Sequence, residues 1–142
     1  MAVQKINCVL LVDDNPATNF LNRKVIENTK LANTINIATN GIEALDYIHS
    51  RGKFSTKKYP KANIIFLDIN MPKMGGFEFL ENYENLDSNL KADIVVVFLT
   101  TSNCVKDKME AKNNEFIFDF IEKPLSENKF QEIYKYYIEN KI

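Results

Sequence analysis

The sequence predicts an α/β fold with a single doubly wound, five-stranded parallel sheet of order 2-1-3-4-5 and five helices. Apolar runs such as residues 64–67 and 94–99 lack polar alternation, which is typical of strands buried on both faces of a sheet, and five predicted strands occur along the chain. They alternate with segments whose apolar residues recur at helical spacing. With right-handed crossovers, strict alternation gives a parallel sheet covered on both faces. Of the doubly wound orders, 2-1-3-4-5 fits a chain of 142 residues.

Composition limits the functions that the chain can have. A hydrophobic content of 45% and a charged content of 26% are those of an ordinary globular protein of one domain. No apolar run is long enough to span a membrane, and residues 1–7 lack a secretory signal. The net charge of −1 argues against nucleic acid as the main partner. We therefore expect a cytoplasmic protein with no membrane or nucleic-acid partner.

The rare residue types are expected to be structural. Cys8 and Cys104 are expected to be free thiols rather than a disulfide or a metal site, as befits a reducing cytosol. His49 is the only histidine, which excludes a histidine-rich metal site, and it is expected on a helix surface.

The predicted strands share a β-prone apolar core followed by a polar residue. They cover residues 6–12, 34–39, 64–67, 94–99 and 116–121. The first run ends in Asp13 and Asp14, and the third ends in Asp68. A carboxylate placed where a buried strand ends is costly to desolvate unless a cation or hydrogen-bond donors face it. Each of these aspartates is therefore either a helix cap or a functional group.

The predicted helices share an apolar stripe. They cover residues 17–28, the segment after Asn40-Gly41, and residues 77–86, 103–113 and 126–140. The stripes comprise Phe20, Leu21 and Val25; Ile42, Leu45 and Ile48; Phe79, Leu80 and Tyr83; Val105 and Met109; and Phe130, Ile133, Tyr134, Tyr137 and Ile138. The fourth stripe is thin, so we expect that helix to be held weakly. Ser126 is the expected N-cap of the last helix.

Residues 50–61 contain five basic side chains together with Gly52 and Pro60. This composition predicts a surface loop. Two interpretations remain open, a solvated connector and an element that docks a partner, and the connector is the simpler one.

The predicted strand order places the ends of strands one and three side by side. Ligands of such sheets bind at the carboxyl ends of the strands where the order reverses, so Asp13, Asp14 and Asp68 should converge there. Three like charges need a counter-charge, and a hard divalent cation such as Mg²⁺ supplies it. Thr100 ends the fourth strand, and Lys123 follows the fifth. This set suits phosphoryl transfer to a carboxylate, although any one of the residues taken alone is better explained as a helix cap or a surface pair.

Four motifs at strand ends carry a resemblance to a known family. They are VDDN at residues 12–15, LDINMPKMGG at 67–76, LTTS at 99–102 and EKPL at 122–125. In this order they resemble the response-regulator receiver domain of two-component systems, which is CheY-like and has the flavodoxin-like strand order 2-1-3-4-5. The resemblance covers nearly all of residues 1–142 and implies a single receiver domain with no output domain.

The resemblance implies a role for each matching residue. Asp68 would accept a phosphoryl group from a phosphohistidine, on a sensor histidine kinase or a histidine phosphotransfer protein. Asp13, Asp14, Asp68 and the Asn70 carbonyl would ligate Mg²⁺, or Mn²⁺ in its place. Lys123 and Thr100 would contact the phosphoryl group. These roles make the chain a signalling phosphoacceptor rather than an enzyme, with slow self-dephosphorylation at most.

The family pattern also implies a switch. Thr100 and Phe120 would carry it, Phe120 standing where many members have Tyr, so an output that needs a phenolic hydroxyl is in question. Asn70 and Ser102 would tune the lifetime of the acyl phosphate. We expect the face formed by the fourth helix, fifth strand and fifth helix to change on phosphorylation and to bind a downstream protein. The 50–61 loop and LTTS resemble stand-alone receivers that accompany phytochrome-type kinases, a subgroup that often forms homodimers.

Three other functions fit the sequence less well. A haloacid-dehalogenase-like phosphatase would need an acid where Asn70 stands. A flavodoxin-like FMN module would have its phosphate repelled by Asp13 and Asp14. A phosphorylation-independent scaffold, or pseudo-receiver, would not need the complete set of site residues.

Overall fold

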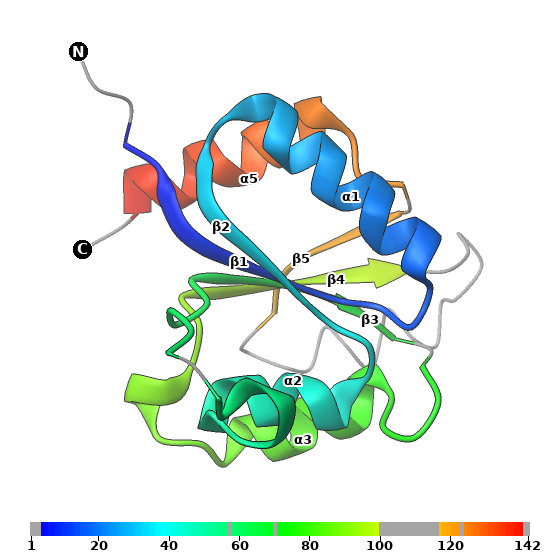
Figure 1. Ribbon diagram of the computed structural model, residues 1–142. Coiled ribbons are helices and arrows are strands. Elements are labelled where there is room, and N and C mark those ends of the chain that lie inside the picture. The colour runs from blue at the N-terminus through cyan, green and yellow to red at the C-terminus, as the bar shows by residue number, and fades with distance from the viewer. Residues whose placement is uncertain (1–3, 57, 70, 100–116, 123, 141–142) are drawn as a thin grey trace.

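The computed structural model describes residues 4–56, 58–69, 71–99, 117–122 and 124–140. Five parallel strands form one sheet in the order β2-β1-β3-β4-β5, which confirms the predicted order (Figure 1). The strands are β1 (Ile6–Val12), β2 (Ala32–Ala38), β3 (Ile64–Asp68), β4 (Ile94–Leu99) and β5 (Ile117–Glu122). Their order brings β1 and β3 side by side, although the β2 strand lies between them in the chain.

Four α-helices cover the two faces of the sheet within the described residues. They are α1 (Pro16–Thr29), α2 (Gly41–His49), α3 (Gly76–Glu84) and α5 (Glu127–Asn140), with short 3₁₀ turns η1 (Gly52–Phe54) and η2 (Ser88–Leu90). Figure 1 shows α1 and α5 on one face and α2 and α3 on the other. The predicted helix over residues 103–113 lies outside the described residues. No helix in the described part of the chain is both long enough and apolar enough to cross a membrane.

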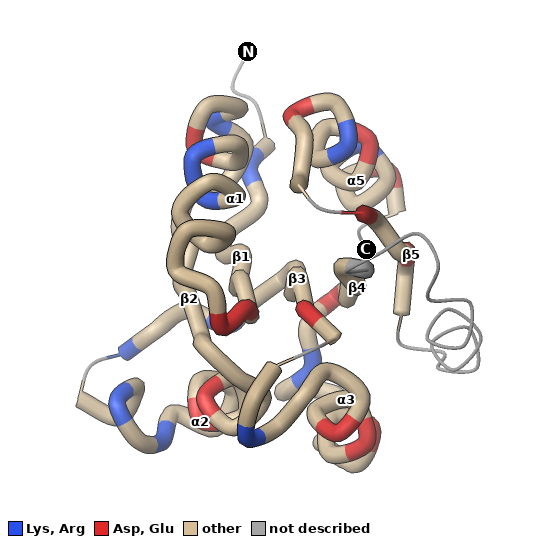
Figure 2. The backbone as a smooth tube through the Cα atoms, turned by 90° about the vertical axis from the view of Figure 1, so that its right-hand side faces the viewer, with Lys and Arg blue, Asp and Glu red and all other residues tan. Residues whose placement is uncertain are grey.

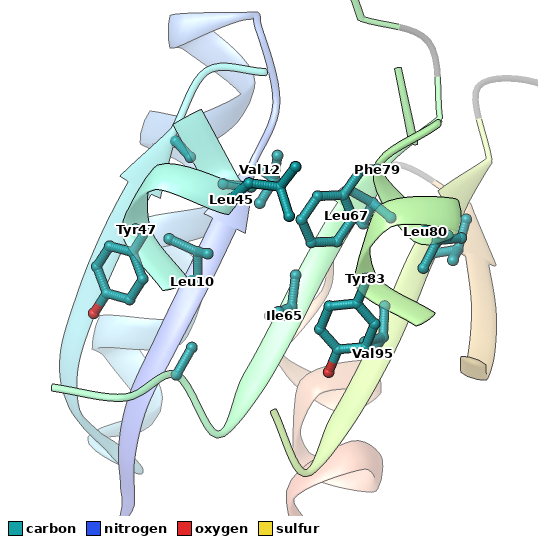
Figure 3. Packing of buried hydrophobic residues seen from close by; sticks show 14 of the residues in the cluster. Leu10, Val12, Leu45, Tyr47, Ile65, Leu67, Phe79, Leu80, Tyr83 and Val95 are labelled. Atoms are coloured by element: carbon teal, nitrogen blue, oxygen red, sulfur yellow. The ribbon is translucent and has the colours of Figure 1, made fainter. Parts of the chain in front are cut away.

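The apolar runs of the central strands supply a core on each side of the sheet. In β1, Cys8, Leu10 and Val12 pack beneath α2 and α3, whereas Ile6, Val9 and Leu11 pack beneath α1 and α5. Figure 3 shows the first core, in which Leu10, Val12, Ile65 and Leu67 meet Phe79 and Tyr83 of α3. The continuous apolar runs therefore indicated strands buried on both faces, as predicted. Cys8 is a buried free thiol.

The predicted apolar stripe of the first helix was wrong. Phe20 and Leu21 are 58% and 56% exposed, while the buried side chains of α1 are Asn19, Asn22 and Ile26. Compared with the orientation that the apolar stripe predicted, the helix is rotated about its axis, and the amides of Asn19 and Asn22 are buried. Those amides bind backbone groups of neighbouring connections, and this tertiary demand outweighs the local apolar pattern.

The second helix departs from its predicted stripe in one place. Leu45 is buried and Ile48 is half-buried, as predicted, but Ile42 is 44% exposed. Tyr47 takes part in the core instead, and its hydroxyl donates a hydrogen bond to the Pro60 carbonyl at 2.5 Å. The third helix buries its predicted residues, and the last helix buries Phe130, Ile133 and Tyr137 while Tyr134 and Ile138 are half-buried. The Ser126 hydroxyl accepts a hydrogen bond from the Lys129 N–H at 3.1 Å, as an N-cap does.

The described residues of the 50–61 segment are mostly exposed, as predicted for a surface loop, but one aromatic side chain anchors it. Phe54, at the end of η1, is 4% exposed, and its ring packs edge-on against Tyr47 at 5.0 Å and Tyr59 at 5.2 Å between centroids. Two of its basic side chains pair with α2: Arg51 with Asp46 at 3.6 Å and Lys53 with Glu43 at 3.0 Å. An aromatic anchor therefore fixes the segment against α2, which the polar composition did not predict.

At the amino ends of the strands, side-chain hydrogen bonds close the connections. The Tyr137 hydroxyl donates to Asp93 Oδ2 at 2.7 Å, and the Tyr83 hydroxyl accepts from the Ala92 N–H at 2.8 Å. Asn63 accepts from the Cys8 N–H at 3.1 Å and donates to Asp93 Oδ2 at 3.2 Å. At this edge of the sheet, neutral donors therefore stabilise the carboxylate of Asp93 and link the connections.

Candidate functional site

The carboxyl ends of β1 and β3 bring three carboxylates together. Val12 is paired with Leu67 across the two strands, so the residues that follow, Asp13 and Asp68, stand next to one another. One oxygen from each of Asp13, Asp14 and Asp68 lies within 4.8 Å of the others. Figure 2 views this edge and shows acidic positions at the ends of both strands, between the α1/α5 layer and the α2/α3 layer. The predicted convergence of the three aspartates is thus present.

Burial makes this cluster electrostatically costly. Asp13 and Asp68 are each 2% exposed, whereas Asp14 is exposed. Like charges this close repel one another, and the repulsion is screened least where the side chains are buried. An all-oxygen, anionic donor set open to solvent on one side is what Mg²⁺ and similar hard cations prefer. The residues present therefore fit a divalent cation.

The connection after β1 orients Asp13 and starts α1. Asp13 Oδ1 accepts a hydrogen bond from the Asn15 N–H at 2.9 Å. Asn15 in turn caps the helix, because its side-chain oxygen accepts from the N–H groups of Ala17 at 2.9 Å and Thr18 at 3.2 Å. Pro16 in the first turn has no N–H to satisfy. One carboxylate oxygen of Asp13 is thus held by the turn, and Asn15 ends the strand-to-helix connection.

The connection after β3 brings the start of α3 against the backbone of Asp68. A Cβ atom on Gly76 would lie 2.7 Å from the Asp68 carbonyl oxygen and 2.8 Å from Ile69 Cα. The Gly76 N–H donates to the Ile69 carbonyl at 2.8 Å. Only glycine fits such a close approach of two backbones. The predicted loop from Asp68 to about Gly76 is confirmed, with α3 beginning at Gly76.

The remaining predicted site residues are only partly placed. Phe120 lies in β5, where it pairs with Val97 of β4 and packs, half-buried, against the core beneath α2 and α3. Asn70, Thr100, Ser102 and Lys123 lie outside the described residues, so their predicted roles stay predictions.

Sequence reasoning missed two polar residues next to the cluster. Asn19 donates from Nδ2 to the Asp13 carbonyl at 2.7 Å, and Asn22 accepts from the Leu125 N–H at 3.4 Å. A signal was present, since two asparagines spaced i, i+3 lie in the helix that follows the aspartate pair and share one helix face. Phe20 and Leu21 lie between them, and their apolar side chains led to a prediction of the wrong buried face for this helix.

Comparisons with known proteins agree with the fold and the acidic cluster. The family model of the response regulator receiver domain matches residues 9–135. Response regulator Rcp1 of Synechocystis is 33% identical over 95 residues, which cover 67% of this chain and 62% of Rcp1. Two-component response regulator ARR17 of Arabidopsis thaliana is 35% identical over 100 residues, covering 67% of this chain and 61% of ARR17. The match thus spans about three fifths of these two relatives.

Solved structures show the same architecture. A two-component response regulator from Cytophaga hutchinsonii superposes with a TM-score of 0.81 at 27% identity, covering 96% of this chain and all of the other. The bacteriophytochrome response regulator AtBRR superposes with a TM-score of 0.78 at 27% identity, covering 92% and 91% of the two chains. With its strand order, its acidic cluster and the family match over residues 9–135, the chain belongs to the response regulator receiver family of two-component signalling.

Proposed function

We propose that this protein is a phosphoacceptor of a two-component phosphorelay, in which Asp68 takes a phosphoryl group from a phosphohistidine. The observation that carries the proposal is the cluster of Asp13, Asp14 and Asp68, whose oxygens lie within 4.8 Å of one another. Receiver domains receive their signal from histidine kinases or phosphotransfer proteins, so the donor is expected to be one of these, in the cytoplasm.

The chemistry is an in-line displacement at phosphorus. A carboxylate oxygen of Asp68 forms the new P–O bond, while the P–N bond breaks and its electron pair stays on the imidazole nitrogen of the donor. The product is an acyl phosphate on Asp68 and a neutral histidine. Because Asp68 is buried at a strand end, its position is fixed before the donor arrives, which lowers the entropic cost of the reaction.

The neighbouring residues are assigned supporting roles. Asp13, Asp14 and the Asn70 carbonyl would hold Mg²⁺ beside Asp68. The bound cation would neutralise charge on the phosphoryl oxygens and so permit attack by an anionic nucleophile. Lys123 and Thr100 would bind phosphoryl oxygens, with Thr100 and Phe120 carrying the change outward. Asn70 and Ser102 would set the lifetime of the acyl phosphate.

Two related proteins support these assignments. The cyanobacterial phytochrome response regulator RcpA, 26% identical with a TM-score of 0.70, has a structure in phosphorylated form. Rcp1, the relative that is 33% identical over 95 residues, has a structure with Mn²⁺ bound. A phosphorylated, metal-binding receiver is therefore the state that we propose for this chain.

Phosphorylation is expected to act through a surface. It adds about −1.5 to −2 charge and three acceptor oxygens at Asp68. The face that includes β5 and α5 would rearrange and bind a downstream protein or a second copy of the chain. Amide hydrogen exchange with and without a phosphate mimic tests this, and an unchanged β5 and α5 would count against it.

The decisive experiment is incubation with acetyl phosphate, with and without Mg²⁺, followed by intact mass spectrometry. Wild-type protein should gain one phosphoryl group only when Mg²⁺ is present, and Asp68→Asn should gain none. A persistent adduct in Asp68→Asn would move the acceptor to another residue. Turnover of a generic phosphate ester would favour a phosphatase instead.

A further inference from the structure

The inward face of α1 is polar where it approaches the acidic cluster. Asn19 and Asn22 are 3% and 1% exposed, whereas Phe20 and Leu21 are exposed by more than half. Burying an amide costs stability unless its polar atoms are hydrogen-bonded, and an exposed apolar side chain forgoes the stabilisation that its burial would give. Departures of this kind are expected at functional sites rather than in parts of a fold that serve only packing.

Asn19 holds the main chain of Asp13. Its Nδ2 donates to the Asp13 carbonyl at 2.7 Å, while the Asp13 N–H donates to the Ala38 carbonyl at 3.1 Å. With the turn bond from Asn15, both main-chain polar groups of Asp13 and one carboxylate oxygen are fixed. The Oδ1 atom of Asn19 is buried and has no hydrogen-bond partner among the described residues. An apolar side chain would avoid that cost, so the contact to Asp13 is what the amide contributes.

Asn22 holds the connection between β5 and α5. Its Oδ1 accepts a hydrogen bond at 3.4 Å from the N–H of Leu125, a residue 103 positions away in the chain and 2% exposed. Leu125 follows Lys123 by two residues in the sequence. Because Asn19 and Asn22 are three residues apart, they share one face of α1. One helix face therefore contacts the connections that follow both β1 and β5.

We propose that Asn19 and Asn22 are positioning residues for the phosphoacceptor site. Asn19 fixes the backbone that carries the Asp13 carboxylate, and Asn22 fixes the backbone just after Lys123. Neither side chain is assigned a contact with the phosphoryl group. The proposal rests on the proposed function of Asp68 and adds the side chains that hold its surroundings in place.

The first test measures metal affinity. Mn²⁺ alone is titrated into wild-type protein and Asn19→Ala by calorimetry. Removal of a group that supports a metal ligand lowers affinity by about 10-fold to 100-fold, and we expect a loss in that range. The matched control is Ile26→Ala, which removes a fully buried side chain two turns further along the same face. That control should lower the free energy of unfolding and leave Mn²⁺ affinity unchanged.

The second test measures phosphorylation rate. At saturating Mg²⁺, Asn22→Ala should lower the maximal rate of phosphorylation by acetyl phosphate about 10-fold, with Mn²⁺ affinity unchanged. Asn22→Leu fills the same space without an acceptor and should be equally slow. If Asn22→Leu regains the wild-type rate, Asn22 acts only by packing, and the proposal fails for that residue.

These outcomes are separable from those of the acetyl phosphate experiment on wild-type protein. If wild-type protein takes up no phosphoryl group, the proposed function fails, yet the Mn²⁺ titration still decides the role of Asn19. The role of Asn22 is then decided by NMR, because Asn22→Ala should shift the amide resonances of Glu122, Lys123 and Leu125, whereas Ile26→Ala should not. Equal loss of Mn²⁺ affinity in Asn19→Ala and Ile26→Ala would overturn the proposal for Asn19.

Discussion

The two ends of the sheet treat charge in opposite ways. At the amino ends, the carboxylate of Asp93 accepts hydrogen bonds from Tyr137 and Asn63, and the hydroxyl of Tyr83 binds the neighbouring backbone. At the carboxyl ends, three carboxylates lie within 4.8 Å of one another, and two of them are buried. One edge places donors around its carboxylate, whereas the other concentrates like charge, which is the arrangement that the proposed cation and phosphoryl group would balance. The same strands thus carry structure at one end and chemistry at the other.

The largest expected effect is stabilisation by Mg²⁺ at the carboxyl edge. A ligand that binds only the folded state at 100 times its dissociation constant adds about 2.7 kcal/mol to the free energy of unfolding. Urea unfolding with and without Mg²⁺ measures this. Asp13→Asn should abolish most of the gain, and Tyr137→Phe, at the other edge, should keep it. An equal Mg²⁺ effect in wild-type protein and Asp13→Asn would remove Asp13 from the metal site.

The next effect concerns the amino edge. Tyr137→Phe removes a hydroxyl that donates to a carboxylate, so we expect the free energy of unfolding to fall by about 1.5 to 3 kcal/mol. Tyr136→Phe is the matched control, since Tyr136 lies next to it on α5 and is 42% exposed. Its effect should stay within about 0.5 kcal/mol. Equal losses in the two variants would show that the Asp93 bond contributes nothing.

Alkaline pH should weaken the amino edge selectively. Burial, with the nearby Asp93 charge, raises the pKa of Tyr83 from 10.0 to about 12. The protonated hydroxyl is thus favoured in the folded state, and its contribution is complete below pH 10 and is lost as the pH rises toward 12. At pH 11 the loss is about 1.4 kcal/mol, one unit of the shift. Urea unfolding between pH 9 and pH 11 should show this decline, and Tyr83→Phe should make it shallower by that amount. Part of the decline should remain, because burial also raises the pKa values of Tyr47 and Tyr137.

The smallest effect is a gain in stability. In the presence of a chelator, Asp13→Asn removes one of three clustered charges and keeps an oxygen that can accept from the Asn15 N–H. We expect the free energy of unfolding to rise by about 1 kcal/mol, because the substitution relieves repulsion between partly screened charges. Asp93→Asn should have the opposite sign, because it weakens the charged hydrogen bond from Tyr137. A destabilised Asp13→Asn would mean that the cluster carries no net repulsion without a cation.

The sequence predicted the strands and the meeting of the three aspartates best, because both depend on position along a strand. Apolar runs gave the strands within about two residues, and the residues after the first and third runs had to meet once the strand order was known. The convergence of Asp13, Asp14 and Asp68 therefore followed from topology alone. The same reasoning predicts Thr100 and Lys123 at this edge. They lie outside the described residues, so their roles stay predictions.

Errors arose where a tertiary partner decides which face of an element is buried. In α1 the apolar residues Phe20 and Leu21 face outward because Asn19 and Asn22 bind backbone from elsewhere in the fold. The 50–61 segment is a surface loop, as its basic residues indicated, but the contacts of Phe54 with the rings of Tyr47 and Tyr59 were not predicted. Periodicity records hydrophobicity along the chain and contains no information on such distant partners.

The contact at Gly76 has a consequence for sequence variation. Any side chain there would meet main-chain atoms of Asp68 and Ile69, and rigid main chain cannot swing aside as a flexible side chain does. In a saturation library selected for folding, position 76 should therefore retain glycine alone, while exposed neighbours such as Glu78 and Glu81 vary freely. A single achiral residue thereby sets where the third helix can begin.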